Sequence, residues 1–201
     1  MRPSFESKFC APPELALRAA ALNRKLVFTN GVFDVLHRGH VTYLAEARAL
    51  GGSLIVALNA DASVKRLGKG DDRPINTLED RMAVIAALEC VSLVTWFEED
   101  TPLARIVESR PEVLVKGGDW AIDKIVGATE VTGWGGTVHA IAFQHERSTT
   151  ATLAKIRAAA GEKHTSKHTR KGCRDTRTVE QGGQLLPPNC LPDTGWGGQE
   201  K

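Results

Sequence analysis

Two histidines three residues apart, His37 and His40, have the types and spacing that phosphate chemistry needs. They follow a short apolar run and precede a segment with helical periodicity, so we expect them at the start of a helix. Side chains at this spacing lie on one helix face, and both imidazoles can then donate hydrogen bonds to one phosphoryl group. Such donors stabilise the charge of a pentavalent phosphorus transition state without forming a covalent bond. The alternative is that both rings cap the helix or sit in the core with backbone partners.

The turn around these histidines has the features of a phosphate cradle. Gly31 permits a tight turn after the apolar run, and Gly39 lets a ligand approach the backbone closely. Backbone N–H groups and the positive end of the helix dipole attract anions at the start of a helix. The segment therefore predicts a phosphate-binding loop between a strand and a helix.

Hydroxyl groups at the start of the last predicted helix offer a second anion site. Ser148, Thr149 and Thr150 supply hydroxyls and backbone N–H groups there, although the same residues also make an ordinary N-cap. Upstream, Gly117 lets a flat base approach the backbone, and Asp119 can accept a hydrogen bond from a base amine or a ribose hydroxyl. The alternative interpretation of Gly117 and Asp119 is an ordinary turn.

Basic residues gather after the second apolar run. Lys65, Arg73 and Arg81 supply the positive charge that a nucleoside triphosphate and a phosphorylated substrate require. A solvated helix face is the usual alternative for such a group of charges.

Five short apolar runs alternate with segments of helical periodicity, and these elements must position the residues above. Branched side chains and bounding turn residues predict strands at 26–29, 53–59, 91–97, 112–116 and 137–143. Helices are predicted at 14–22, 41–50, 60–67, 78–89, 102–109 and 149–160. The alternation predicts an α/β fold, a doubly wound parallel sheet with helices on both faces. Its ligand site should lie at the carboxyl ends of the strands, where strand order reverses.

Composition divides the 201 residues into three parts. We expect an N-terminal helical extension at 1–24, packed on the sheet edge, and the sheet domain at 25–161. Residues 162–201 have too few apolar side chains to offset chain entropy, so we expect a disordered polar tail. That tail carries seven Lys and Arg against five Asp and Glu, which leaves the preceding residues neutral. A neutral body lacks the basic face of a nucleic-acid-binding protein.

The chain shows neither a membrane segment nor a metal-binding pattern. No stretch approaches the roughly 18 apolar residues of a bilayer span, and residues 1–9 lack the apolar run of a signal peptide. The four cysteines form no C-x-x-C pair, and no carboxylate cluster suggests a dedicated metal site. We therefore expect a cytoplasmic protein with reduced thiols and no membrane partner.

The histidine segment resembles a known signature. Gly31-x-Phe33-Asp34-x-x-His37-x-Gly39-His40 is similar to the H-x-G-H signature of the cytidylyltransferase-like nucleotidyltransferases, a superfamily with a Rossmann-like fold. Further segments resemble its sugar-phosphate members, the heptose 1-phosphate adenylyltransferases: Asn59–Val64, Arg73–Asn76, Glu79–Arg81, Val115–Trp120 and Ser148–Thr150. In many relatives an arginine stands several residues before the S-T-T motif, whereas here Arg147 stands directly before it. The role of Arg147 is therefore open.

This resemblance implies a reaction and a set of roles. It implies transfer of AMP from ATP, which carries Mg²⁺, to D-glycero-β-D-manno-heptose 1-phosphate, giving ADP-heptose for lipopolysaccharide inner-core synthesis and pyrophosphate. It also implies a homo-oligomer, a dimer or higher. The expected catalytic residues are His37, His40 and Lys65. The expected nucleotide-binding residues are Thr29, Asn30, Gly31, Phe33, His37, Gly39, His40, Gly117, Asp119, Ser148, Thr149 and Thr150. The expected substrate-binding residues are Asp34, Asn59, Lys65, Arg73 and Arg81.

Two other functions are open at this point. A cytidylyltransferase acting on glycerol 3-phosphate or phosphoethanolamine would use the same fold, and only nucleotide competition separates ATP from CTP. A non-enzymatic nucleotide sensor would bind ATP without releasing pyrophosphate. A class I aminoacyl-tRNA synthetase also uses H-x-G-H, but this chain has no K-M-S-K-S-like loop and is too short.

Overall fold

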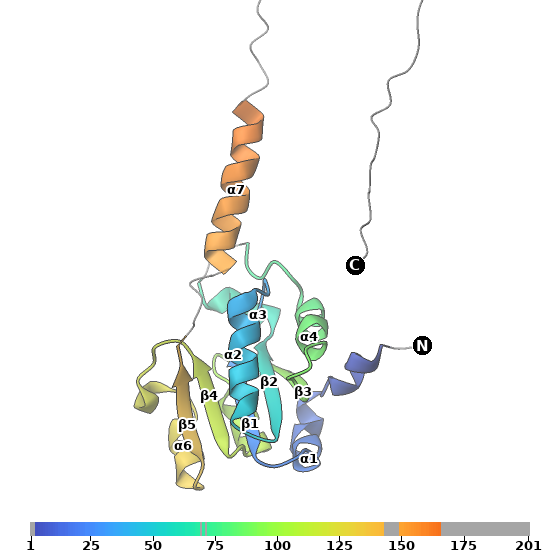
Figure 1. Ribbon diagram of the computed structural model, residues 1–201, viewed down its shortest axis with the longest axis vertical. Coiled ribbons are helices and arrows are strands. Elements are labelled where there is room, and N and C mark those ends of the chain that lie inside the picture. The colour runs from blue at the N-terminus through green and yellow to red at the C-terminus, as the bar shows by residue number, and fades with distance from the viewer. Residues whose placement is uncertain (1–2, 69, 71, 143–148, 166–201) are drawn as a thin grey trace, which may run out of the picture.

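The computed structural model of the chain describes residues 3–68, 70, 72–142 and 149–165. Five parallel strands form one sheet: β1 (Leu26–Gly31), β2 (Ser53–Asn59), β3 (Leu93–Phe97), β4 (Val113–Gly117) and β5 (Thr137–Ile141). Their order is β3-β2-β1-β4-β5, so strand order reverses between β1 and β4 (Figure 1). The predicted α/β sheet of five parallel strands is confirmed.

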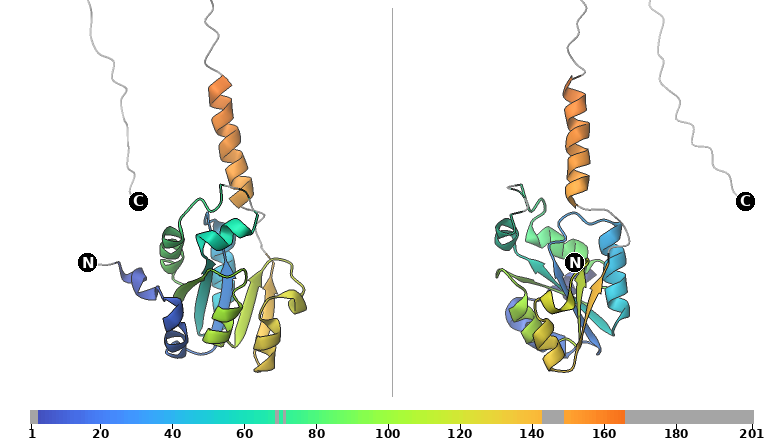
Figure 2. Two further views of the ribbon diagram at one scale, coloured as in Figure 1. Left: turned by 180° about the vertical axis from the view of Figure 1, so that it is seen from behind. Right: turned by 90° about the vertical axis from the view of Figure 1, so that its left-hand side faces the viewer.

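Helices cover both faces of the sheet (Figure 2). The α-helices are α1 (Leu15–Ala20), α2 (Arg38–Ala49), α3 (Asp61–Arg66), α4 (Leu78–Ala86), α5 (Leu103–Ser109), α6 (Ala128–Gly133) and α7 (Thr149–Thr165). Three short 3₁₀ helices are η1 (Ser4–Lys8), η2 (Pro12–Glu14) and η3 (Ile122–Lys124). Side chains of α2 and α4 pack in one apolar core, and those of α1, α5 and α6 pack in another.

Each central strand is buried on both faces because alternate residues enter these two cores. On β1, Val27 packs with α2 and α4, whereas Leu26 and Phe28 pack with α1, α5 and α6. All seven residues of β2 are buried. Burial on both faces explains why the strands read as nearly continuous apolar runs in the sequence.

The N-terminal residues contact the edge of the sheet through Phe9 and Cys10, whereas the helix that was expected at this edge packs beside α5. Phe9 forms a parallel bridge with Val94 of β3, and the Cys10 N–H donates to the Val94 carbonyl at 2.9 Å. The predicted helix at 14–22 is shorter in the structure, where α1 ends at Ala20 and lies beside α5.

Among the α-helices of the described residues, α6 was not predicted. It has six residues, two of them threonine and one valine, and it follows Gly127, whose φ is 89°. Such a short segment with β-branched residues shows no helical periodicity. A Cβ at residue 127 would lie 2.7 Å from the side chain of Ile106, so glycine there serves both the turn and the close packing on α5.

The last helix, α7, rises from the carboxyl edge of the sheet and points away from the domain (Figures 1 and 2). It continues to Thr165, beyond the predicted helix end at 160. The prediction of a disordered tail falls mostly on 166–201, outside the described residues. In the described part of the chain, no helix is both long and apolar enough to cross a bilayer.

Candidate functional site

A cleft with two lobes opens at the carboxyl ends of β1 and β4, where strand order reverses. The first lobe, of about 410 Å³, includes His37, His40, Arg73, Gly117, Thr149 and Thr150 in its lining. The second lobe, of about 430 Å³, includes Asn59, Phe97, Thr101, Lys124, Ile125 and Val126. The two lobes are adjacent because five residues line both: Asn30, Gly31, Val32, Lys116 and Trp120. The cleft thus lies where the fold predicts a ligand site.

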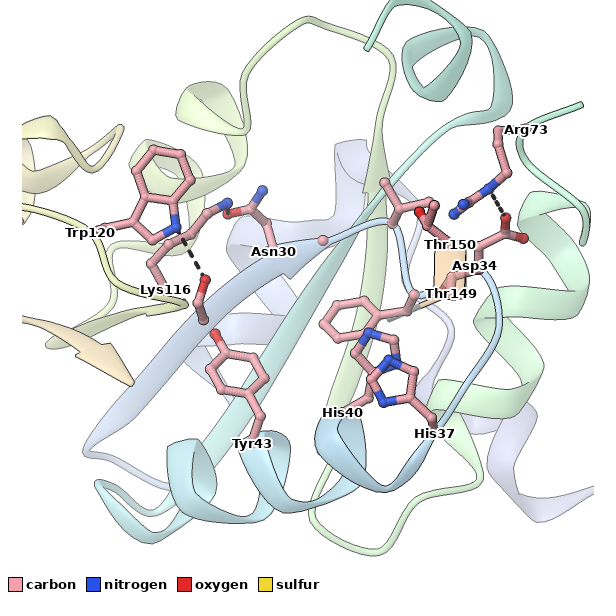
Figure 3. Close-up of a pocket in the computed structure, with 14 residues that line it drawn as sticks. Asn30, Asp34, His37, His40, Tyr43, Arg73, Lys116, Trp120, Thr149 and Thr150 are labelled. Atoms are coloured by element: carbon pink, nitrogen blue, oxygen red, sulfur yellow. Dashed lines mark hydrogen bonds and ion pairs between the residues drawn. The ribbon is translucent and has the colours of Figure 1, made fainter. Parts of the chain in front are cut away.

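The two predicted histidines meet in the first lobe (Figure 3). His37 is the N-cap residue of α2, and the backbone N–H of His40 donates to the His37 carbonyl at 2.9 Å in the first helical turn. Their rings stack with centroids 3.8 Å apart and an interplanar angle of 20°. The start of α2 therefore presents both imidazoles to the same cavity.

Phe33 fixes the position of His40 from the preceding turn. The Phe33 ring meets the His40 ring edge to face, with centroids 5.3 Å apart. Phe33 has a φ of 48°, a left-handed conformation that a bulky residue adopts only where its surroundings require it. A Cβ at residue 31 would lie 2.8 Å from the Phe33 ring, so Gly31 is needed for this close approach.

His40 is neutral at physiological pH. Burial, and then the nearby His37, lower the pKa of His40 to about 4. Its Nδ1 atom is buried and has no hydrogen-bond partner among the described residues. Buried polar atoms without a partner are rare in folded proteins, and they call for an explanation such as a ligand or a water. A neutral imidazole offers one donor and one acceptor, so His40 can bind a phosphoryl oxygen without carrying a charge.

Asp34 faces Arg73 in the structure. Its carboxylate lies 2.5 Å from Arg73 Nε and accepts from the backbone N–H groups of Ile75 and Asn76 at 2.9–3.0 Å. Burial alone would raise the pKa of Asp34, but these hydrogen bonds and the Arg73 charge outweigh it and lower that pKa. These contacts join the β1–α2 turn to residues 73–76. Asp34 also lines the first lobe, so its expected role in substrate binding stays a prediction.

Arg81 was also expected to bind substrate, but its side chain is completely buried and lines neither lobe. Its guanidinium donates to the carbonyls of Val32 and Asn59, both at 2.8 Å, and lies 2.6 Å from a carboxylate oxygen of Asp61. These contacts occupy the donors that a phosphate would need, so direct contact with substrate is not supported.

Three further predicted residues lie outside the lining of the cleft. Thr29 is buried within β1, and its hydroxyl lies 2.5 Å from the Tyr43 hydroxyl. Lys65 is exposed on α3, and Asp119 is exposed in the loop after β4. The roles expected for them from the family resemblance are not supported by the described contacts.

The other predicted residues are close to their expected positions. Asn30, Gly31, Phe33, Gly117, Arg73, Thr149 and Thr150 line the first lobe, and Asn59 lines the second. Gly39 is buried in the first turn of α2. Ser148 and Arg147 lie outside the described residues.

Sequence analysis did not select two residues that line both lobes, Lys116 and Trp120. The Lys116 ammonium lies 3.3 Å from the Asn30 side-chain oxygen, and the half-exposed Trp120 donates its indole N–H to the Gly117 carbonyl at 3.2 Å. Both belong to the Val115–Trp120 segment, whose position at the end of a predicted strand could have identified them.

Comparison with known proteins matches residues 28–160 to the cytidylyltransferase-like family model. The D-beta-D-heptose 1-phosphate adenylyltransferase of Bordetella bronchiseptica is 57% identical over 155 residues, which cover 76% of this chain and 96% of that protein. The bifunctional protein HldE of Hahella chejuensis is 55% identical over 139 residues. That match covers 69% of this chain but only 29% of the Hahella protein, so the chain spans less than a third of such bifunctional relatives.

Solved structures show the same fold. A lipopolysaccharide core biosynthesis protein from Thermoplasma volcanium superposes with a TM-score of 0.50 at 29% identity, covering 61% of this chain and 98% of the other. The pantoate-beta-alanine ligase of Francisella tularensis gives a TM-score of 0.54 at 13% identity, and the match covers 80% of this chain and 79% of the other. At that low identity the second similarity concerns the fold alone.

Proposed function

This chain belongs to the cytidylyltransferase-like family, and on that premise we propose that it transfers AMP from ATP to D-glycero-β-D-manno-heptose 1-phosphate. The products are ADP-heptose, a precursor for the lipopolysaccharide inner core, and pyrophosphate. The observation that carries the proposal is the 57% identity over 96% of the length of the Bordetella relative, which is named for heptose 1-phosphate adenylyltransferase activity.

In this proposal ATP occupies the first lobe and the sugar phosphate occupies the second. Thr149 and Thr150 at the start of α7 face the first lobe together with the two histidines, and this combination of hydroxyls and imidazoles suits a chain of phosphates. The second lobe carries Asn59, Thr101 and Lys124 among apolar side chains, a mixture that suits sugar hydroxyls and a phosphate.

The reaction requires positioning more than acid–base chemistry. A phosphate monoester oxygen is already a nucleophile, so it can attack the α-phosphorus of ATP in line while pyrophosphate leaves. His37 and His40 hydrogen-bond to the α-phosphoryl oxygens as charge develops on them. Lys116, at the junction of the lobes, supplies positive charge where the two anions approach each other.

We propose that Mg²⁺ enters with the triphosphate. The carboxylates lining the two lobes are Asp34 and Asp100, and both form ion pairs, with Arg73 and Arg66 respectively. The described residues contain no group of three or more side chains that could hold a metal ion. The described residues that line the two lobes therefore do not fit a dedicated metal site.

The proposal extends to compartment and assembly. A reaction that consumes ATP and a sugar phosphate fits the cytoplasm, and the family resemblance suggests a dimer or a higher homo-oligomer. Sedimentation velocity of the purified chain measures the assembly directly.

Pyrophosphate release tests the proposed reaction. ATP and CTP are each combined with Mg²⁺ and with heptose 1-phosphate, glycerol 3-phosphate or phosphoethanolamine. Release with ATP and heptose 1-phosphate alone supports the proposal. Release with CTP and a smaller phosphate would retain the fold and mechanism but contradict the substrate, whereas ATP binding without release from any combination would favour a nucleotide sensor.

A further inference from the structure

The largest fully buried side chain in the described part of the chain is a charged one, that of Arg81 on α4. Its guanidinium donates through Nη1 to the Val32 carbonyl at 2.8 Å and through Nε to the Asn76 carbonyl at 3.1 Å. Its Nη2 donates to the Asn59 carbonyl at 2.8 Å and to Asp61 at 2.6 Å. One side chain thus contacts three backbone carbonyls and one carboxylate.

These positions belong to the walls of both lobes. Val32 lies in the β1–α2 turn and lines both lobes, and Asn59 ends β2 and lines the second lobe. Asn76 precedes α4, and its backbone N–H and side-chain amide both donate to Asp34 in the β1–α2 turn. Arg81 therefore fixes the turn that carries the histidines relative to the end of β2.

No other residue type can make the same set of contacts. Burying a charge is unfavourable unless its donors are satisfied, and here three carbonyls and a carboxylate surround the guanidinium. A planar guanidinium presents several N–H groups in fixed directions, whereas a lysine ammonium is a compact charge with three donors. A lysine at residue 81 has three donors for these four acceptors, so at least one of them would lose its donor.

We propose that Arg81 is a positioning residue that sets the two lobes of the cleft at the separation and angle required for in-line attack. The inference rests on the proposed function, in which the nucleotide and the sugar phosphate occupy different lobes. Arg81 lines neither cavity, so changing it removes no side chain from the lining of either lobe. Binding of each substrate alone should therefore persist while the reacting atoms lose their alignment.

The test is steady-state kinetics of Arg81→Lys with ATP and heptose 1-phosphate. A small misplacement of reacting groups costs about a hundredfold in rate, so we expect kcat to fall by about that factor while both KM values change little. The matched control is Arg105→Lys, which alters a buried arginine of α5 that pairs with Glu99 and Glu108 outside the cleft. The control should keep the wild-type kcat.

A second variant and a measurement independent of activity cover the case in which Arg81→Lys does not fold. Asp61→Ala removes only the partly exposed carboxylate partner, and we expect kcat to fall by about fivefold, in line with the loss of one such ion pair. Amide hydrogen exchange should become faster at 31–36 and 57–62 in Asp61→Ala but not in Arg105→Lys.

The outcomes separate this inference from the proposed function. A wild-type kcat in Arg81→Lys or Asp61→Ala, or unchanged exchange at those two segments, would overturn the positioning role. Loss of thermal stability with kcat per folded molecule unchanged would show a purely structural role and would also overturn it. An inactive wild-type protein would instead contradict the proposed reaction, and hydrogen exchange would still show whether Arg81 holds the two walls together.

Discussion

Two neighbouring groups of side chains contact the β1–α2 turn, and they differ in whether their polar atoms are charged and have partners. The histidine group, Phe33, His37 and His40, faces the first lobe with a neutral His40 whose Nδ1 has no partner among the described residues. The arginine group, Asp34, Arg73, Asn76 and Arg81, is buried or half-buried, and its three charged members form ion pairs. Figure 3 labels His37 and His40 of the first group and Asp34 and Arg73 of the second, with a dashed line joining Asp34 to Arg73.

The contrast shows which polar residues a fold leaves available for a ligand. A buried charge is tolerated only when nearby groups satisfy it, and a satisfied guanidinium has little left to offer a phosphate. Burying a neutral imidazole costs less free energy than burying a charged group, and one of its ring nitrogens can remain available for a hydrogen bond to a ligand. In this molecule the buried Arg81 holds the turn from outside both lobes, whereas the neutral His40 lines the first lobe.

The largest expected effect is the loss of stability when the arginine group is broken. Asp34→Ala leaves Arg73 buried without its carboxylate, and removing one partner of such a pair costs about 3–5 kcal/mol. Urea denaturation followed by circular dichroism measures this loss. Asp100→Ala is the control, because its ion pair with Arg66 is exposed and should contribute less than about 1 kcal/mol. Equal effects of the two changes would mean that burial does not set the strength of the Asp34 pair.

The next largest effect is expected in the histidine group and should appear in rate rather than stability. His40→Ala removes a transition-state donor, so kcat should fall by about a hundredfold or more while the fold is kept. Pyrophosphate release and circular dichroism measure the two properties on the same sample. His139→Ala, on β5 and outside both lobes, should retain wild-type activity. An active His40→Ala protein would remove His40 from the mechanism.

A smaller effect is expected at Trp120, which lies between the two lobes and belongs to neither group. Trp120→Ala removes a wall common to both cavities, so the KM values for ATP and for the sugar phosphate should each rise several-fold with kcat nearly unchanged. Trp134→Ala is the matched control, since the Trp134 indole N–H donates to the Pro111 carbonyl and its ring lies outside both lobes. A large fall in kcat at unchanged KM would instead assign Trp120 to alignment of the reacting groups.

Local sequence patterns were sufficient for the sheet and for the place of the cleft. Strand β2 has the predicted bounds because its residues 54–58 are all apolar and two glycines precede it. The motif residues Gly31, His37 and His40 could be located because glycine and paired histidines between a strand and a helix are typical of a phosphate-binding turn. The short helix α6 escaped prediction because six residues with three β-branched members form a helix only through tertiary packing.

The roles of the charged residues could not be predicted because they depend on partners distant in sequence. Arg81 and Asn59 are separated by 22 residues, and Asp34 and Arg73 by 39. A basic residue near a phosphate site has the same appearance in a sequence whether its side chain points into the cavity or into the protein. Only the burial of Arg81 and its contacts with the backbone distinguish these cases.

The smallest effect expected is a difference between the two groups in their response to acid. Burial holds the pKa of His40 at about 4 in the folded protein, below its ordinary value, so the unfolded chain binds a proton first as the pH falls. The stability contributed by neutral His40 is therefore complete above about pH 6.5 and declines as the pH falls toward 4. The pKa of Asp34 is lowered as well, because backbone hydrogen bonds and Arg73 outweigh the effect of burial. Its contribution to stability is lost only below the ordinary carboxyl range.

Thermal unfolding of the wild-type protein and of His40→Gln between pH 4 and 7 separates the contributions of the two groups to stability. The variant should show a weaker fall of Tm in this window than the wild type, and identical slopes would mean that His40 is not buried in its neutral form.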